Sequence, residues 1–552
     1  MTAEYRRGST YLTPTPDPSD GAAVPFAQVL HSLVEEARSR LRARCGTLSD
    51  AISSDAHVML ERSLLRTLSS ICGQVLILRF SLFRFHHDPV GTSREESPPN
   101  HEQYDCFIDE ILKGGLGRFF AEYPALENLV KVCMNQWVCA TAEFLERLRA
   151  DRTEIASLLC GDDPGAAISI QTDLSDRHDG GRTVIGLQFE SGSRLVYKPK
   201  DLGSEGAYFS ILNWFNHNGA PLDFRIVRVL RRDGYGWVEF VEQRPCPGAE
   251  EAQRYYRRAG HLLCVIYLLA GVDCHFDNLI ACGEYPVLVD TEMLFQPNLA
   301  DYRSADGGTV LRTGLLPRPT AEACDFSGLG CVSDQSTRFR IPEWRETNRD
   351  AMSLCFRAAM IHPRNNVPVL GGVPLSPLDY VGPVIEGFRE MYRCVLINRK
   401  RLLDPEGPLA CIAAQKVRIL ARGTPEYYLV LSRALHPKCL RTAGCPEIKF
   451  QSNSRFPFLE PLETEALQQM NVPRFLVEAS AKTLVNPNGA KVCASFSQSG
   501  FERVISEISN LSEAHLEQQV KLIRFAWAFS GLSRILSCLL ILCGLTLFLG
   551  GC

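Results

Sequence analysis

Residues 272–295 read VDCHFDNLIACGEYPVLVDTEMLF, and this stretch decides the fold that the sequence predicts. A polar loop is followed by an apolar strand, a turn at GEYP and a second strand that ends in acidic residues. The polar side chains of interest are Asp273, His275 and Asn278 in the loop, and Asp290 and Glu292 after the strand. The two acidic residues are two positions apart, so they are expected to share one face. Carboxylates and an amide oxygen are the groups that hold Mg²⁺ in phosphoryl-transfer sites.

The segment before this stretch predicts two β-hairpins separated by a helix. Ile185, Leu187 and Phe189 alternate with smaller or polar residues, and a glycine-containing turn leads to a second strand that ends at Lys198. A helix, SEGAYFSILNWFN, follows, and the strands FRIVRVL and WVEFV then flank the turn RRDGYG. Strand, strand with lysine, helix, strand, strand is the order of a kinase N-lobe. Lys198 is then the cation expected on the phosphates of ATP.

The loop 273–278 has the pattern DxHxxN, and a metal-binding Asp follows it at short distance. This pattern resembles lipid kinases of the phosphatidylinositol type more than protein kinases, and the sequence has no GxGxxG loop. The segment SDRHDGGR, which contains Asp176 and His178, is instead expected to lie over the phosphates of ATP. Its paired glycines, Gly180 and Gly181, permit close backbone approach. The predicted fold is α+β, with a kinase-like (lipid-kinase-like) bilobal catalytic core and added N-terminal and C-terminal helical regions.

Bulk composition excludes several classes of function. The net charge of −4 and the pI near 6.3 give none of the basic character of a nucleic-acid binder, so no nucleic-acid partner is expected. The 21 cysteines are spread along the chain without a CxxC pair, which argues against a zinc ribbon or a thioredoxin-type motif. The N-terminus has no apolar signal-peptide core. Reduced thiols and a cytoplasmic location are therefore expected.

One long apolar stretch lies near the C-terminus, where residues 535–549 read ILSCLLILCGLTLFL. It is slightly shorter than the roughly 17–25 residues that span a bilayer as a helix. Three interpretations stay open. The stretch is a short tail anchor that brings the chain to a membrane, a buried helix whose covering domain is absent, or an aberrant reading frame at a broken gene end.

The exact amino-acid sequences of many segments indicate a family more specifically than the spacing of their polar residues does. The blocks LVYKPKDL, YGWVEFV, DCHFDNLIACGEYPVLVDTEMLF, VLRTGLLP, DFSGLG and RILARGTPEYYLVL resemble the dehydratase domain of class II (LanM-type) lanthipeptide synthetases. The similarity runs from about Asp105 to Trp527. The resemblance implies ATP- and Mg²⁺-dependent phosphorylation of Ser and Thr in a precursor peptide made of leader and core. It further implies elimination of the phosphate to give dehydroalanine and dehydrobutyrine.

The resemblance also implies residue roles. For phosphoryl transfer these residues are the phosphate-binding Lys198, Gly180 and Gly181, the catalytic Asp273 and His275, and the metal-holding Asn278, Asp290 and Glu292. Asp176 and His178 are expected close to the phosphates, and their part in transfer or elimination stays open. Elimination is expected from Arg418 and Thr424 of RILARGT, with Arg422 alongside. An arginine suits this step because its paired donors match a phosphate group.

Full LanM enzymes continue into a zinc-dependent cyclase domain, which this sequence has no room for after Trp527. Zinc is therefore not expected, and a separate cyclase is a candidate partner. Two alternatives to an active dehydratase stay open: a truncated remnant that only binds the precursor peptide, and a kinase that phosphorylates without eliminating. The predicted divisions are a disordered tail (1–24), an N-terminal helical region (25–165), a kinase-like N-lobe (166–245), a kinase-like C-lobe with the elimination segment (246–460), a helical region (461–530) and an apolar tail (531–552).

Overall fold

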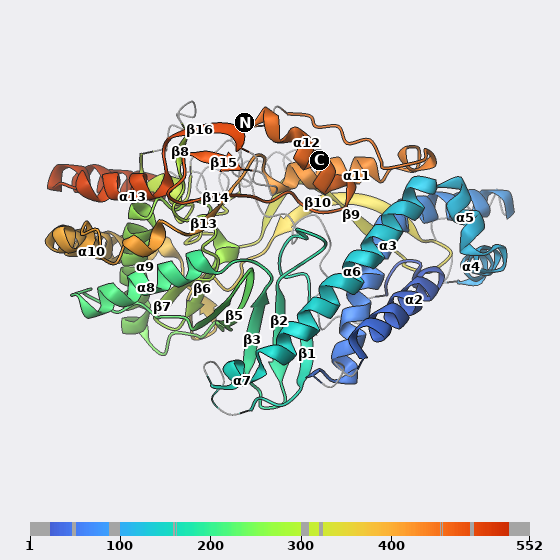
Figure 1. The fold of residues 1–552 in the computed structure, drawn as a ribbon, viewed down its shortest axis with the longest axis horizontal. Helices are drawn as coiled ribbons and strands as arrows, with labels where there is room; N and C mark the ends of the chain where they lie inside the picture. The colour runs from blue at the N-terminus through green and yellow to red at the C-terminus, as the bar shows by residue number, and fades with distance from the viewer. Residues whose placement is uncertain are drawn as a thin grey trace, which may run out of the picture.

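The computed structural model describes residues 23–46, 51–87, 100–157, 161, 163–299, 308–318, 324–452, 454, 456–485 and 491–528. Nearly all of the predicted tail 1–24 and the whole predicted tail 531–552 lie outside these residues, as does the apolar stretch 535–549. The described chain combines long helices with small antiparallel sheets, which confirms the α+β class (Figure 1).

The N-terminal part, predicted as a helical region, consists of helices. Its helices are α2 (Ala27–Cys45), α3 (Ser54–His87), α4 (Glu102–Gly114), α5 (Leu116–Glu122), α6 (Pro124–Ala150) and the short α7 (Arg152–Ile155). Their apolar faces form one core, in which Leu64 and Leu68 of α3 are fully buried. Within the described residues α3 is the one helix that is long and apolar enough to cross a membrane. Because it packs inside this core, that property is weak evidence for a membrane segment.

A five-stranded antiparallel sheet with the order β1-β2-β3-β5-β4 follows the helices. The strands are β1 (Ala167–Gln171), β2 (Ile185–Phe189), β3 (Arg194–Lys198), β4 (Val229–Arg232) and β5 (Tyr235–Glu239). The predicted hairpin is confirmed, since Ile185 pairs with Tyr197 and Leu187 with Leu195. Alternate residues of β3 face opposite sides: Leu195 and Tyr197 enter the N-terminal core. Lys198 therefore lies on the other side of the sheet, away from α6, which crosses the sheet in Figure 1.

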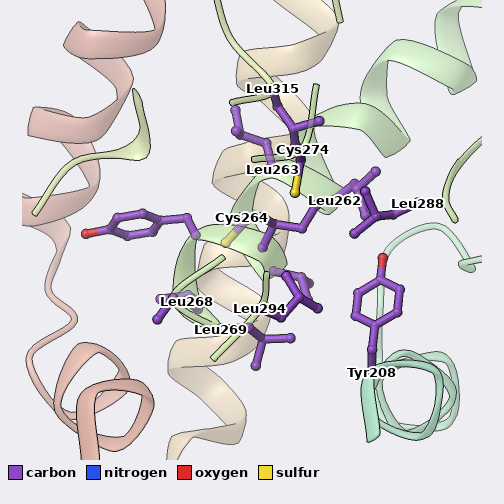
Figure 2. Packing of buried hydrophobic residues seen from close by; sticks show 14 of the residues in the cluster. Tyr208, Leu262, Leu263, Cys264, Leu268, Leu269, Cys274, Leu288, Leu294 and Leu315 are labelled. Carbon is purple, nitrogen blue, oxygen red and sulfur yellow. The ribbon is translucent and has the colours of Figure 1, made fainter. Parts of the chain in front are cut away.

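The second core lies on that other side. Helix α8 (Gly203–His217) follows β3, and α9 (Ala249–Leu268), β6 (Leu279–Cys282) and β7 (Tyr285–Leu288) come next, with α10 (Val381–Leu402) packed along α9. Figure 2 shows Tyr208 of α8 beside Leu288 and Leu262, and Cys274 and Leu315 beside Leu263. This core thus joins the sheet layer to the loop that carries the predicted catalytic residues.

The remaining strands pair over long distances in the chain. They are β8 (Asn298–Leu299), β9 (Gln335–Arg345), β10 (Ser353–Ile361), β11 (Val369–Leu370), β12 (Val373–Pro374), β13 (Lys416–Ile419), β14 (Phe475–Glu478), β15 (Thr483–Val485) and β16 (Lys491–Gln498), with helices α11 (Thr424–Ala434), α12 (Glu460–Gln468) and α13 (Gly500–Ser509). Strand β13 pairs with β14, and β16 pairs with β8. The range 461–530, predicted as helical, therefore also contains three strands. Their partners lie far away in sequence, so local periodicity does not reveal them.

Candidate active site

Two buried lysines lie at and just beyond the end of β3. The ammonium group of Lys198 lies 3.3 Å from Oε1 of Glu205 on α8 and donates to the backbone oxygen of Val289 at 2.7 Å. Lys200, two residues later, lies 3.5 Å from the same carboxylate oxygen. Glu205 is only 1% exposed, so the sheet and α8 are joined by ion pairs that are shielded from solvent.

Lys200 also contacts the two acidic residues after β7. Its ammonium group lies 3.3 Å from Oδ1 of Asp290 and 2.9 Å from Oε2 of Glu292. The two carboxylates therefore converge on one positive charge, as expected for residues i and i+2. Burial alone would lower the pKa of Lys200, but the negative charges of Asp290, Glu292 and Glu205 outweigh it and hold the pKa above its usual value.

The polar loop lies directly beside this acidic pair. The backbone N–H of Val289 donates to the carbonyl oxygen of Asn278 at 2.9 Å, and the side-chain amide of Asn278 donates to the carbonyl of Asp273 at 2.8 Å. Asp273 has a left-handed backbone, with φ 64°, which is uncommon for a residue other than glycine. The ring nitrogen Nδ1 of His275 accepts from the backbone N–H of Asp277 at 3.3 Å. The loop is thus held in one shape by its own side chains.

Two other blocks of the sequence support the loop from behind. The N–H of Cys274 donates to the carbonyl of Thr313 at 2.9 Å, and the N–H of Phe276 donates to that of Phe326 at 3.2 Å. Glycines permit this approach, because a Cβ at Gly314 would lie 3.0 Å from the Cys274 nitrogen and one at Gly328 would lie 2.5 Å from its oxygen. The blocks VLRTGLLP and DFSGLG therefore act as a backbone frame for the predicted catalytic loop.

The predicted elimination segment reaches the same cluster through Glu292. A guanidinium nitrogen of Arg418, on β13, lies 2.6 Å from Oε1 of Glu292, and the backbone N–H of Arg418 donates to the carbonyl of Glu292 at 3.0 Å. Arg418 is 3% exposed. Thr424, at the start of α11, is 1% exposed. Glu292 is thus held by Lys200 on one oxygen and by Arg418 on the other.

Arg422, which lies between these two residues in sequence, belongs to a different cluster. Its guanidinium group pairs with Glu463 at 3.1 Å, with Glu426 at 3.0 Å and with Glu460 at 2.5 Å. The side chain of Glu463 is completely buried, and burial raises its pKa. All three carboxylates belong to α11 or α12, so Arg422 fixes the packing of these helices rather than facing Asp290 or Glu292.

The glycine-containing loop is a tight turn beside the elimination segment. His178 and Arg182 exchange backbone hydrogen bonds at 3.0 and 2.9 Å, and Gly180 and Gly181 between them have φ of 87° and 80°. The ring nitrogen Nδ1 of His178 lies 2.7 Å from the carbonyl of Val472 and therefore donates to it. Burial lowers the pKa of His178 well below its usual value, and the charge of Arg418 lowers it further.

Asp176 is tied to α11. The hydroxyl of Tyr428 donates to Oδ1 of Asp176 at 3.0 Å, and Asp176 is 5% exposed. Burial raises the pKa of Tyr428 well above its usual value, and the neighbouring carboxylate raises it further, so the phenol keeps its proton and remains a donor. The contacts of Asp176 and His178 thus lead to the segments around Arg418 and Thr424.

The predicted site residues therefore fall into connected groups. In one group, the backbone of Val289 contacts both Lys198 and Asn278. In the other, Lys200 pairs with Asp290 and Glu292. Glu292 in turn pairs with Arg418. Sequence reasoning missed Lys200 and Glu205. The available signal was a second lysine two positions after the first, and an acidic residue in the first turn of the next helix.

Across the described parts of the chain, no group of three or more His, Cys, Asp or Glu side chains is arranged to hold a metal ion. A cation site here depends on two carboxylates together with the amide of Asn278. The amide nitrogen is used in the bond to Asp273, so the amide oxygen is the atom that a hard cation would take.

Comparison with known proteins shows that one family model covers all of these residues. Residues 123–478 match the family described as "Domain of unknown function (DUF4135)", and this range includes every predicted site residue from Asp176 to Thr424. The chain is also similar to the lacticin 481/lactococcin biosynthesis protein LcnDR2 of Lactococcus lactis subsp. lactis. The two are 25% identical over 519 residues, which cover 85% of this chain and 52% of that protein. The chain thus spans about half the length of the curated relative that it matches.

Proposed function

The chain belongs to the DUF4135 family, and on that premise we propose that it is an ATP-dependent dehydratase of Ser and Thr in a lanthipeptide precursor peptide. The similarity to a lacticin 481/lactococcin biosynthesis protein supports a precursor peptide, with leader and core, as the substrate. One observation carries the proposal. Glu292 contacts both Lys200 and Arg418, so the residues that we assign to the two half-reactions meet at one carboxylate.

The donor set fits a magnesium ion. Asp290 and Glu292 already converge on a single cation, the ammonium of Lys200, and the amide oxygen of Asn278 is the third hard donor. In this proposal Asn278 and Asp290 hold the ion, and Glu292 supports them. When bound, Mg²⁺ neutralises charge on the phosphates of ATP, and ATP supplies the phosphoryl group.

The lobes of the proposed kinase-like core are the five-stranded sheet with α8 and the helical core around α9. Protein kinases use an ion pair between a strand lysine and a helix glutamate to hold the lysine on the phosphates. Lys198 and Glu205 form a pair of this kind across β3 and α8. Asp273 is the proposed acceptor of the proton that the Ser or Thr hydroxyl loses as its oxygen attacks phosphorus. His275 orients the loop, and Gly180 and Gly181 cover the phosphates.

The second half-reaction removes the α-proton of the phosphorylated residue while the bond between the β-carbon and the phosphate oxygen breaks. A double bond remains in the peptide, and inorganic phosphate leaves. Arg418 stabilises the charge that develops on the departing phosphate, and Thr424 donates a hydrogen bond to it. We assign His178 as the base, because its Nδ1 carries the hydrogen bonded to Val472 and its Nε2 is left with the lone pair. Asp176 holds the turn against Tyr428.

The decisive experiment is a mass spectrum of the precursor peptide after incubation with the chain, ATP and Mg²⁺. Stepwise loss of water is expected, while gain of phosphate alone would mean a kinase that does not eliminate. An unchanged mass, with peptide binding shown separately, would mean a remnant that only binds. Asp290→Asn should abolish phosphate incorporation. The matched control is Asp233→Asn in the exposed turn between β4 and β5, which should leave the products unchanged.

A separate cyclase is the partner that the proposal adds for the next reaction, because dehydrated residues are electrophiles that cysteine thiols attack. Contact of residues 535–549 with a membrane is a second proposal about partners. Fractionation of cells that express the chain with and without these residues tests it, and an unchanged distribution would contradict it.

A further inference from the structure

Lys200 differs from Lys198 in what it contacts. Among the described residues Lys198 has Glu205 as its ion-pair partner and donates to the backbone carbonyl of Val289, rather than pairing with the acidic residues after β7. Lys200 is shared among three carboxylates, and its shortest contact, 2.9 Å, is to Glu292. It is 9% exposed, so little solvent screens these interactions. The two lysines share Glu205 but differ in their other contacts, and only Lys200 pairs with the acidic residues after β7 among the described residues.

The oxygens that Lys200 binds are those that a metal ion would need. Its contacts are Oδ1 of Asp290 and Oε2 of Glu292, which belong to the proposed metal-holding residues. Magnesium binds carboxylate oxygens at about 2.0–2.1 Å, so an ion on these atoms would lie next to the ammonium group. Two cations at such a separation repel each other strongly, because the site is buried. The ammonium group and a metal ion therefore compete for these oxygens.

We propose that Lys200 is a built-in competitor for the metal site, which weakens binding of the metal ion alone and is displaced when the ion arrives together with nucleotide phosphates. This inference rests on the proposed function, because it takes Asp290 and Glu292 as metal-holding residues. The phosphates compensate the displacement by offering the ammonium group new acceptors, which a lysine on its flexible stem can reach. Metal binding and nucleotide binding thereby become coupled through one side chain, and each favours the other.

The proposal predicts how the affinity of the chain for a divalent cation depends on nucleotide and on Lys200. Without nucleotide the chain should bind a divalent cation weakly, since Lys200 holds the ligands. With nucleotide the cation should bind more tightly. Removing the ammonium group should remove most of this difference by strengthening binding of the metal ion alone. Lys200 is thus a positioning residue for the metal and the phosphates, distinct from Lys198, whose removal should weaken nucleotide binding without strengthening metal binding.

The test is titration of Mn²⁺ by electron paramagnetic resonance on the full chain without nucleotide. Lys200→Met should bind Mn²⁺ about tenfold tighter or more, the scale on which one charge affects a neighbouring ionic equilibrium. The matched control is Lys482→Met, whose ion pair with Glu502 at 2.8 Å is half exposed, and this variant should bind Mn²⁺ as the wild type does. With ATP present, the difference between Lys200→Met and the wild type should shrink or reverse. Equal or weaker binding by Lys200→Met without nucleotide would overturn the inference.

Two further measurements test the inference if Lys200→Met unfolds and distinguish it from the proposed metal site. If Lys200→Met unfolds because three carboxylates are left together, Mn²⁺ should restore its thermal unfolding midpoint, and failure to do so counts against the inference. The second arm separates the inference from the proposed function. Asp290→Asn should abolish binding of Mn²⁺ in the presence of ATP. If it does not, the proposed metal site itself is wrong, whereas loss of binding in Asp290→Asn with no effect of Lys200→Met refutes only the competition.

Discussion

Replacing Glu205 by Gln should destabilise the chain and slow phosphoryl transfer, because this substitution removes a buried charge at nearly constant volume. Glu205 is 1% exposed, and its Oε1 lies 3.3 Å from the ammonium of Lys198 and 3.5 Å from that of Lys200. Lys200 keeps Asp290 and Glu292 as partners in the variant. Lys198 keeps only the carbonyl of Val289, so its charge loses the carboxylate that compensates it.

The size of the effect follows from these distances. At an effective dielectric constant of about 20, two unit charges 3.3 Å apart attract each other by about 5 kcal/mol. The desolvation of both groups offsets part of this, but breaking a buried pair on one side still costs about 3–5 kcal/mol, because the other charge stays buried. The unfolding free energy of Glu205→Gln should fall by an amount in that range. Phosphoryl transfer should fall about 100-fold, since Lys198 is no longer held in one position.

The assay is the midpoint of urea unfolding, followed by fluorescence, together with the initial rate of phosphate incorporation into the precursor peptide. The matched control is Glu250→Gln on α9, because the Glu250 side chain is 91% exposed and its ion pair with Arg254 is 3.9 Å long. That variant should change the unfolding free energy by less than about 0.5 kcal/mol. If Glu205→Gln unfolds at the same urea concentration as Glu250→Gln and transfers phosphate at the wild-type rate, the reasoning about the buried pair is wrong.

Three further predictions use other parts of the structure. Arg418→Ala should let phosphorylated peptide accumulate, with elimination slowed by about 10²–10³, and a mass spectrum that shows normal dehydration would refute its assignment. Gly387→Ala should destabilise the chain by about 1–3 kcal/mol or more, because the added Cβ would overlap the backbone oxygen of Arg257 on α9. Gly382→Ala, in the first turn of the same helix and with no atom within 4 Å outside its chain neighbours, should change the stability by less than about 0.5 kcal/mol, and thermal unfolding distinguishes the two variants. Burial lowers the pKa of His261, so below about pH 6.5 the unfolded chain binds a proton that the folded chain does not. The unfolding free energy should therefore fall by at most about 1.4 kcal/mol per pH unit as the pH falls through this range. Urea unfolding of His261→Gln should show a shallower dependence of stability on pH.

Features that depend on neighbours in the chain were predictable from the sequence. The hairpin of β2 and β3 is visible in the alternation from Ile185 to Phe189, and the antiparallel pairing of the two strands confirms it. The pairing of β6 with β7 follows from two apolar strands around one turn, and it places Asp290 close to Asn278. Both are short-range contacts, for which period-2 patterning and turn residues carry the information. The family could also be recognised from the sequence, because the resemblance depends on the residues of several sequence blocks and not on tertiary contacts.

The contact between the residues predicted for phosphoryl transfer and those predicted for elimination was not predictable in this way. Arg418 and Glu292 are 126 positions apart, and Asp176 and Tyr428 are 252 positions apart. Neither pair leaves a local signal, because each member is one charged or polar residue whose partner lies in a segment far away in the sequence. The roles of VLRTGLLP and DFSGLG as a frame for the loop around Cys274 were hidden for the same reason, since backbone hydrogen bonds between segments depend on no particular side chain.

The sequence by itself determined the α+β class, the local elements that carry the polar residues, and the family. Only the tertiary structure decided that Lys200 and Glu205 belong to the cluster, that Arg422 does not, and that Glu292 lies between Lys200 and Arg418. The physical reason is the range of the forces involved. Local patterning is set by the geometry of one strand or helix, whereas the partner of a buried charge is set by whichever segments the packing of both cores brings together.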